Sequence, residues 1–252
     1  MQTSPFLTLV INLDRSPQRL LAISKQLAGL NMPWERLPAA EGKLYSLEDA
    51  ELVDLPEFGR RHGKTPLHGE LGCYLSHVWA MRRFLETDSP YALILEDDVH
   101  IAAHLPQVLD VLAACSADWD MVKLSGVHSG TPLKIKSLGN VGSLVVTLTP
   151  YTGSSAYVIN RQAAQRYASD LLPMRVPYDH EFDRGWHWGL KVRAVMPPAC
   201  GHDQSGESMI NTTAVNRKFH WTRRLPAMGW RLQNQWRRLI YGWRVWLRFR
   251  LN

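Results

Sequence analysis

The sequence predicts an α/β fold with a largely parallel sheet. Short apolar segments typical of strands alternate, up to residue 195, with longer segments of helical periodicity. Chains with this alternation form a sheet covered by helices. The 252 residues, 45% of them hydrophobic, are sufficient to bury one sizeable core. We therefore expect a main catalytic domain, residues 1–215, followed by an appended segment, residues 216–252.

The expected elements follow in order from hydrophobic periodicity and turn residues. Strands are expected at residues 6–11, 34–37, 91–95, 120–124, 144–148, 155–159 and 191–195. Helices are expected at residues 16–30, 46–52, 69–85, 103–115 and 161–171. Pro17 suits a first helical turn, because that turn leaves the N–H that proline lacks unpaired anyway. The glycines and basic residues of residues 56–68 predict a mobile loop.

Three consecutive carboxylates, Glu96, Asp97 and Asp98, directly follow the apolar strand 91–95. In an extended chain alternate side chains share a face, so Glu96 and Asp98 point together while Asp97 points away. Carboxylates crowded in this way repel one another unless a cation compensates them. The triplet therefore predicts a site for Mn²⁺ or Mg²⁺ against a diphosphate; a strand that ends in a solvated acidic turn is the alternative.

Charge is distributed unevenly along the chain. Residues 216–252 carry ten of the 29 basic residues and no acidic one, which leaves 19 basic and 23 acidic residues in 1–215. At about 100° per residue, an apolar arc roughly 120° wide faces an arginine-rich side. The arc holds Trp236, Leu239, Ile240, Trp243, Trp246 and Leu247, and the other side Arg231, Arg237, Arg238, Arg244 and Arg248. This pattern is typical of an interfacial helix. We expect membrane contact through Trp236, Arg237, Arg238, Trp243, Arg244 and Trp246.

Other features predict the compartment. The N-terminus has no secretory leader pattern, and residues 137–160, the longest uncharged stretch, hold too many glycines and hydroxyls for a transmembrane helix. Cys73, Cys115 and Cys200 are odd in number and lack metal-ligand spacing, so reduced, mostly buried thiols are expected. These features predict a cytoplasmic protein.

Several segments carry a family resemblance in a fixed order. They are Val10-Ile11-Asn12-Leu13-Asp14-Arg15-Ser16-Pro17-Gln18-Arg19, Gly69-Glu70-Leu71-Gly72-Cys73-Tyr74-Leu75-Ser76-His77, Leu95-Glu96-Asp97-Asp98-Val99, Gly153-Ser154-Ser155-Ala156-Tyr157-Val158-Ile159 and Pro177-Tyr178-Asp179. The chain thereby resembles glycosyltransferase family 25, the lipopolysaccharide and lipooligosaccharide galactosyltransferases related to the collagen galactosyltransferases. It departs from the family at Ser154 or Ser155, where threonine is common, and at Tyr178, where valine is usual.

The resemblance implies the nucleotide-sugar-binding GT-A form of the fold, with ligands beyond the carboxyl ends of the strands. It implies a donor site formed by Asn12, Leu13, Arg15, Arg19, Ser76, His77 and Asp97. The metal is expected on Asp98, with Glu96 contributing directly or through water and His202 as a further candidate ligand. For Arg15 and Arg19 the alternative is a solvated helix face, and for His77 alone it is a structural histidine.

The family is inverting, which implies a single general base acting on the acceptor hydroxyl. Asp179 is the first choice because it occupies the family's Pro-x-Asp position, and Glu181 and Asp183 are the alternatives. All three could instead stabilise the start of a short helix.

The expected activity is metal-dependent transfer of galactose from UDP-galactose to a lipid-linked core oligosaccharide, on the inner face of a bacterial inner membrane. Three alternatives remain: a different donor sugar, a nucleic-acid-binding protein that uses the basic aromatic tail, and a non-catalytic membrane-docking module. Against nucleic acid, the excess charge is confined to the last 37 residues and no base-reading motif occurs in the body.

Overall fold

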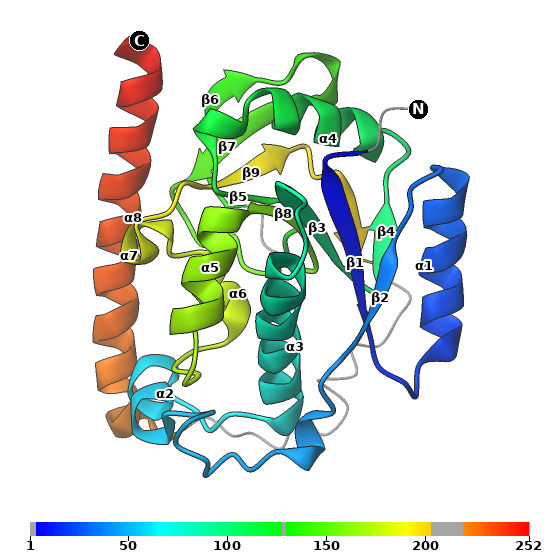
Figure 1. Ribbon diagram of the computed structural model, residues 1–252. Coiled ribbons are helices and arrows are strands. Elements are labelled where there is room, and N and C mark those ends of the chain that lie inside the picture. Colours follow the sequence, from blue (N-terminus) through cyan, green and yellow to red (C-terminus); the bar gives the residue numbers. More distant parts are fainter. Residues whose placement is uncertain (1–3, 128–129, 203–218, 252) are drawn as a thin grey trace.

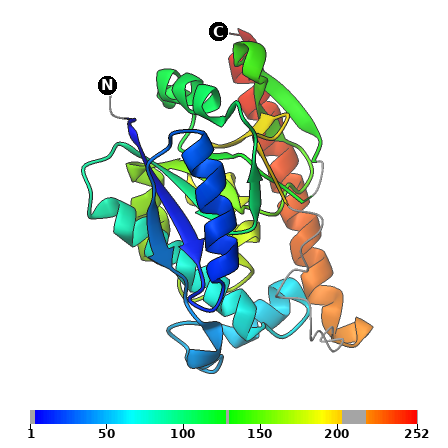
Figure 2. The same cartoon turned by 90° about the vertical axis from the view of Figure 1, so that its right-hand side faces the viewer.

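The computed structural model describes residues 4–127, 130–202 and 219–251, apart from the side chain of His202. Figure 1 and Figure 2 show it in two views. The strands are β1 (Phe6–Asn12), β2 (Glu35–Pro38), β3 (Tyr91–Glu96), β4 (Val99–Ile101), β5 (Met121–Lys123), β6 (Pro132–Ser137), β7 (Ser143–Thr147), β8 (Ala156–Asn160), β9 (Val192–Met196) and β10 (Cys200–His202). The α-helices are α1 (Pro17–Gly29), α2 (Leu55–His62), α3 (His68–Leu85), α4 (Leu105–Ala114), α5 (Arg161–Asp170), α6 (Tyr178–Phe182), α7 (Gly185–Trp188) and α8 (Leu225–Leu251).

The main sheet of the described residues has eight strands in the order β2-β1-β3-β8-β5-β9-β7-β6. β1 is parallel to β2 and β3, and β5 is parallel to β9, whereas β8 opposes β3 and β5, and β7 opposes β9 and β6. Six of the eight strands therefore run in one direction, with β8 and β7 reversed. This confirms the expected α/β class. The sheet is mixed, because three of these neighbouring pairs are parallel and four are antiparallel.

Helices cover both faces of the sheet and create two cores. One face packs against α3 and α5 and buries aromatic side chains such as Tyr74, Phe84 and Tyr167. The other packs against α1 and α4 through Ile23, Leu27 and neighbouring apolar residues. The fold is thus α/β, and β10 pairs with β4 beside the carboxyl end of β3.

The segment expected to be a mobile loop, residues 56–68, instead contains α2. Asp54 caps this helix by accepting the N–H of Glu57 at 3.1 Å, and Gly63 ends it in the left-handed region with φ 75°. Glu57 pairs with Arg60 and Arg61 within the helix. The basic residues read as loop-forming are thus neutralised on a short capped helix. The expectation of a loop was wrong.

One further expectation, the helix at residues 46–52, fails. Residues 46–52 form turns, and the nearest helical element is the 3-10 turn Gly42–Leu44. Strand β6 was not expected; it pairs with β7 through a register shift between Lys134 and Lys136. Its alternating basic and apolar residues suit a sheet edge, where one side of the strand meets solvent.

Helix α8 lies against the body along its length (Figure 1) and contacts α2, α7, β6 and β7. Ala227, Asn234, Arg238 and Gly242 are buried in this contact. Arg238 was expected to face a membrane, and this was wrong: it points inward because Asp183 offers it a buried carboxylate. The expected boundary between residues 215 and 216 lies outside the described residues. Within them, no helix has the length and apolar character needed to cross a membrane.

Candidate active site

Glu96 ends β3, and its carboxylate is the centre of a polar cluster. The oxygen Oε1 accepts from Tyr178 Oη at 2.5 Å, from His77 Nε2 at 3.2 Å and from Cys73 Sγ at 3.7 Å. Burial, followed by the nearby Glu96 charge, raises the pKa of the Tyr178 hydroxyl and of the Cys73 thiol well above their usual values. Both groups therefore keep their protons and act as donors. They hold Glu96 in one orientation at the end of the strand.

His77 is fully buried and fixed from two sides. Its Nδ1 lies 2.9 Å from the Tyr157 hydroxyl, and its ring stacks on that of Tyr178 with centroids 4.0 Å apart. A proton on Nε2 lets the ring donate to Glu96, while Nδ1 meets the Tyr157 hydroxyl. The histidine of the Ser-His motif is therefore a support for Glu96.

The Gly-Glu-x-Gly-Cys-x-x-Ser-His segment forms the start of α3, and its spacing has a structural reason. Cys73 and His77 are four residues apart, so they share the helix face that meets Glu96. Gly72 faces another segment, where an added Cβ would lie 2.7 Å from the carbonyl oxygen of Ala40. Ser76 is buried; it accepts the N–H of Ala40 and donates to the carbonyl of Gly72. Ser76 thus fastens α3 to the segment after β2.

Asn12 lies at the end of β1, where the strand register pairs Ile11 with Glu96. Its amide donates to Asp97 Oδ2 at 2.6 Å and to the carbonyl of Ser16 at 3.0 Å, while its own oxygen accepts from Arg36 Nε at 3.1 Å. Burial raises the pKa of Asp97, against the opposing effects of Asn12 and Arg19. Asn12 is therefore the residue that holds Asp97.

Arg19, on the first turns of α1, reaches across to the acidic triplet. Its Nη1 lies 3.5 Å from a carboxylate oxygen of both Asp97 and Asp98. Arg15 turns elsewhere and pairs with Glu41. Leu13 belongs to the turn that links β1 to α1, where its carbonyl accepts the N–H of Ser16. Of the residues expected at the donor, Asn12, Arg19 and His77 contact the triplet, to which Asp97 itself belongs. Arg15 lies in a separate ion pair.

The Pro-Tyr-Asp segment meets the same cluster from the start of α6. Gly153 donates its N–H to Asp179 Oδ2 at 3.0 Å, and Ser155, two residues on, accepts the N–H of Glu96 at 2.7 Å. Gly153 has φ 79°, and a Cβ at this position would lie 2.6 Å from Val127. Only glycine suits this backbone geometry. The segment before β8 therefore joins Asp179 to the end of β3.

Glu181 and Asp183, the alternative bases, are buried and already paired. Arg184 Nη1 lies 2.7 Å from Glu181 Oε2, and Asp183 accepts from Arg238 and from the N–H of Tyr151. Burial raises the pKa of Glu181, although the charge of Arg184 opposes this effect. Asp179 is the half-buried member of the three. It is therefore the most accessible carboxylate of the three.

The donor atoms at the triplet suit a hard cation. Asp98 and Asp97 offer carboxylate oxygens, the ligands that Mg²⁺ and Mn²⁺ prefer, and the Asp98 side chain is 34% exposed. Glu96 is less accessible, at 22%, and its Oε1 already takes three donors. The ligand atoms of Cys73, His77 and Glu96 also lie within 4.8 Å of one another, close enough to hold an ion. The backbone of His202 pairs with Val99, next to Asp98; its side chain lies outside the described residues.

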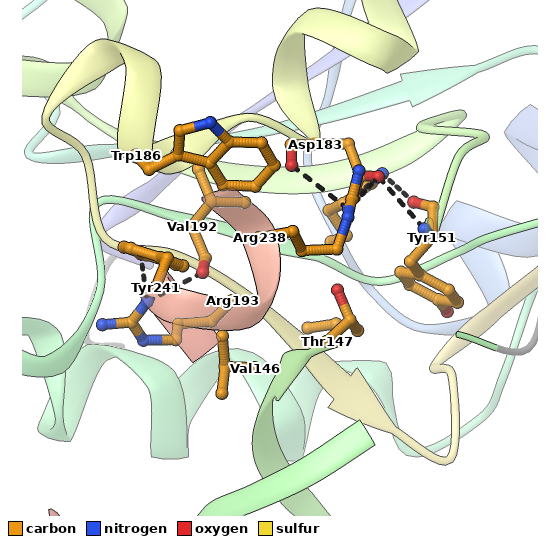
Figure 3. A pocket seen from close by; sticks show the side chains of 12 residues that line it. Val146, Thr147, Tyr151, Asp183, Trp186, Val192, Arg193, Arg238 and Tyr241 are labelled. Carbon is orange, nitrogen blue, oxygen red and sulfur yellow. Dashed lines mark hydrogen bonds and ion pairs between the residues drawn. The ribbon is translucent and has the colours of Figure 1, made fainter. Parts of the chain in front are cut away.

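A small cavity lies beneath α8, away from the triplet (Figure 3). Side chains from β5, β7, β9, α7 and α8 line it, and Arg238 points past it toward Asp183 and Tyr151. The Nε atoms of Arg193 and Arg238 and Nε1 of Trp186 are buried there without a hydrogen-bond partner among the described residues. Ordered water suits such orphaned donors. The cavity thus belongs to the contact between α8 and the body.

Sequence reasoning missed three members of the cluster: Cys73, Tyr157 and Tyr178. Each stands inside a segment that resembles the family, and that position was the available signal. Cys73 was read as a packing residue because it lies on an apolar helix. Its role becomes visible only when α3 is placed against β3.

Comparisons with known proteins identify relatives of this chain. Residues 6–181 match the family described as Glycosyltransferase family 25 (LPS biosynthesis protein). A Glycosyltransferase 25 family member of Aedes aegypti is 31% identical over 45% of this chain and 20% of its own length. Human procollagen galactosyltransferase 2 is 24% identical over 62% of this chain and 26% of its length. Procollagen galactosyltransferase 1 of Danio rerio is 26% identical over 68% of this chain and 30% of its own length.

The chain thus spans less than a third of the length of each of these relatives. Among solved structures, a glycosyltransferase involved in the glycosylation of the major capsid of PBCV-1 aligns with a TM-score of 0.40 and 9% identity, over 90% of this chain and 98% of that one. The family match covers well over half of the chain and includes the residues around Glu96 and Asp179. The chain belongs to glycosyltransferase family 25.

Proposed function

We propose that this chain transfers galactose from UDP-galactose, with inversion, to a hydroxyl of a lipopolysaccharide or lipooligosaccharide core oligosaccharide. The observation that carries the proposal is the convergence of Glu96, two residues before Asp98, and of Asp179 on the segment before β8. The galactosyltransferase names of the human and zebrafish relatives support the donor, and the family description supports the acceptor class.

Asp179 serves as the general base in this proposal. Its two oxygens accept the N–H groups of Gly153 and His180 at 3.0 Å each, which fixes the carboxylate and leaves further lone pairs for the acceptor. The acceptor hydroxyl gives its proton to Asp179 as its oxygen bonds to the anomeric carbon. The bond from that carbon to the diphosphate breaks in the same displacement, and UDP leaves.

The donor lies beside Asp97, Asp98 and Arg19 in this proposal. Asp98, with Glu96 contributing directly or through water, would hold Mn²⁺ or Mg²⁺, which would offset charge on the leaving diphosphate. Arg19 already reaches both aspartates, so its guanidinium is placed to donate to phosphate oxygens as well. Asn12 keeps Asp97 oriented toward a ribose or sugar hydroxyl.

A donor survey tests the proposal. The purified chain is incubated with Mn²⁺, a core oligosaccharide acceptor and, in turn, UDP-galactose, UDP-glucose and UDP-N-acetylglucosamine, and the anomeric proton coupling of the product is read by NMR. Turnover highest with UDP-galactose and a β-linked product is expected. Higher turnover with another donor refutes the galactose assignment, and an α-linked product refutes inversion.

A nucleic-acid-binding function has less support. Arg238, one of the tail's basic residues, is ion-paired with Asp183, and Arg231 donates to the carbonyl of His62 at 3.0 Å. Both side chains are thereby turned toward the protein rather than toward a phosphate backbone. A non-catalytic docking module also has less support. Its tail would have no reason to contact the segment that carries Asp179, whereas Arg238 pairs with Asp183 in that segment.

A further inference from the structure

The outer face of α8 carries a continuous stripe of large apolar side chains. Its members are Leu225, Met228, Leu232, Trp236, Ile240, Trp243, Leu247 and Leu251, between 46% and 82% exposed. At about 100° per residue they fall within an arc of roughly 140°. We call this surface the α8 stripe. A helix of 27 residues is about 40 Å long. The helix that carries the stripe runs along most of one side of the molecule (Figure 1).

The stripe cannot turn inward, because the opposite face of the helix is locked to the body. Asn234 Oδ1 accepts from Arg184 Nε at 3.1 Å, and Arg238 pairs with Asp183. At Gly242 the helix lies so close to the sheet that a Cβ would be 2.5 Å from a methyl carbon of Leu148. The packed face thus fixes which side chains meet solvent. An exposed apolar surface of this length marks an interaction site.

The charged side chains of α8 are all of one sign. Arg237, Arg244 and Arg248 are exposed along one edge, and α8 contains no acidic residue. Trp236 and Trp243 stand within the stripe itself, and indole rings favour the boundary between apolar chains and water. Apolar, aromatic and cationic side chains thus occur together on one outer face.

We propose that the α8 stripe docks on an anionic lipid surface, with the helix parallel to the membrane plane. Lipid chains would take up the apolar side chains, and anionic headgroups would meet Arg237, Arg244 and Arg248. A second copy of the chain fits less well. A symmetric pair of stripes would offer these arginines no carboxylate from the partner's α8, because that helix carries none.

Docking would also orient the active site. Arg238 lies on the packed face of the same helix, and its partner Asp183 is four residues from Asp179. A membrane that holds α8 therefore holds the segment with the proposed base in a fixed position. A lipid-linked acceptor and the catalytic end of the sheet would then share one surface.

Flotation with vesicles tests the proposal. The full chain is mixed with vesicles of phosphatidylglycerol and phosphatidylethanolamine, or of phosphatidylcholine alone, without donor or acceptor. Binding to the anionic vesicles is expected, at least tenfold weaker for Trp236→Ser/Trp243→Ser and for Arg237→Gln/Arg244→Gln/Arg248→Gln. Higher salt should also weaken it. Equal binding to both vesicle types would refute the role of charge.

Two control variants match the changes in chemistry. Leu21→Ser/Leu44→Ser removes two exposed apolar side chains outside α8, and Lys25→Gln/Arg82→Gln/Lys134→Gln removes three exposed charges. Both controls should float like wild type. If they lose binding as the stripe variants do, or if the stripe variants float normally, the stripe is not the docking surface.

Analytical ultracentrifugation without lipid tests for a second copy of the chain as the partner. A second copy is the partner if the wild-type chain forms a dimer that Trp236→Ser/Trp243→Ser disrupts and if the chain does not bind vesicles. A negative flotation result would not contradict the proposed transfer reaction, because the vesicle assay contains neither donor nor acceptor.

Discussion

Arg238 of α8 and Asp183, the residue after α6, form a buried ion pair that joins the basic tail to the segment carrying Asp179. Lys123 lies 3.9 Å from the other Asp183 oxygen, and burial lowers the pKa of Lys123 although the Asp183 charge opposes this effect. The tail is thus fastened to the body through an ionic cluster. Helix α8 supports the candidate active site as well as presenting the stripe.

Removal of Arg238 should destabilise the protein strongly. Arg238→Ala leaves Asp183 buried without its nearest cation, which typically costs about 3 to 5 kcal/mol. Arg237→Ala is the matched control, because Arg237 is the preceding residue of the helix and is exposed. Loss of its side chain should change the free energy of unfolding by less than about 0.5 kcal/mol. Urea unfolding measures both. Equal values for the two variants would show that the ion pair does not fasten α8.

Tyr178→Phe should impair transfer without unfolding the protein. The change removes one donor to Glu96 but keeps the ring stacked on His77. We expect kcat to fall about tenfold and KM for UDP-galactose to change little, because Glu96 is only partly released. Tyr91→Phe, at the opposite end of β3, is the control and should behave like wild type. An unchanged kcat for Tyr178→Phe would mean that the hydroxyl does not position Glu96.

Transfer should require a divalent cation held at the triplet. Asp98→Asn removes one ligand charge and almost no volume, so we expect turnover to fall on the order of a hundredfold or more, with Glu96→Gln close behind. Asp110→Asn removes an exposed carboxylate on α4 and is the matched control. Full turnover in excess EDTA, measured by UDP release, would rule out the requirement.

Mild acid should destabilise the protein through His62. Burial, then the neighbouring His180, lowers the pKa of His62 to about 2. The unfolded histidine titrates near 6.5, so below that pH the unfolded chain takes up a proton that the folded chain refuses. From pH 7.5 to pH 5 this amounts to about 2 kcal/mol of lost stability. Burial lowers the pKa of His180 too, which adds in the same direction.

His62→Phe keeps an aromatic ring beside Phe58 and removes the proton uptake. The free energy of unfolding is measured in urea at pH 7.5 and at pH 5. Between these two values it should decrease by about 2 kcal/mol less for His62→Phe than for wild type. His100→Gln, at an exposed position of β4, should fall like wild type. An equal decline for wild type and His62→Phe would locate the acid sensitivity elsewhere.

The sequence was sufficient for those parts of the fold that depend on local pattern. The apolar run before Glu96 predicts β3, and parallel strands bring Asn12 to the same edge of the sheet. The helical period of the tail also predicts α8. Such features need only neighbouring residues and a periodicity, which a sequence displays directly.

The remaining features depend on partners far along the chain. Composition cannot distinguish Arg238 from Arg237, because the difference is Asp183, 55 residues away. Helix α2 was not predicted because its caps, Asp54 and Gly63, enclose only eight residues. The role of Tyr178 arises only where α6 meets β3, 82 residues earlier.

The most direct test of the account compares turnover with donor affinity in Asp179→Asn. Turnover is measured with UDP-galactose and a soluble core oligosaccharide, and UDP affinity by calorimetry in the presence of Mn²⁺. If Asp179 takes the acceptor proton, turnover falls on the order of a thousandfold while the Kd for UDP stays within about threefold of wild type. Near-normal turnover, or a loss of UDP affinity as large as the loss of turnover, would contradict the assignment.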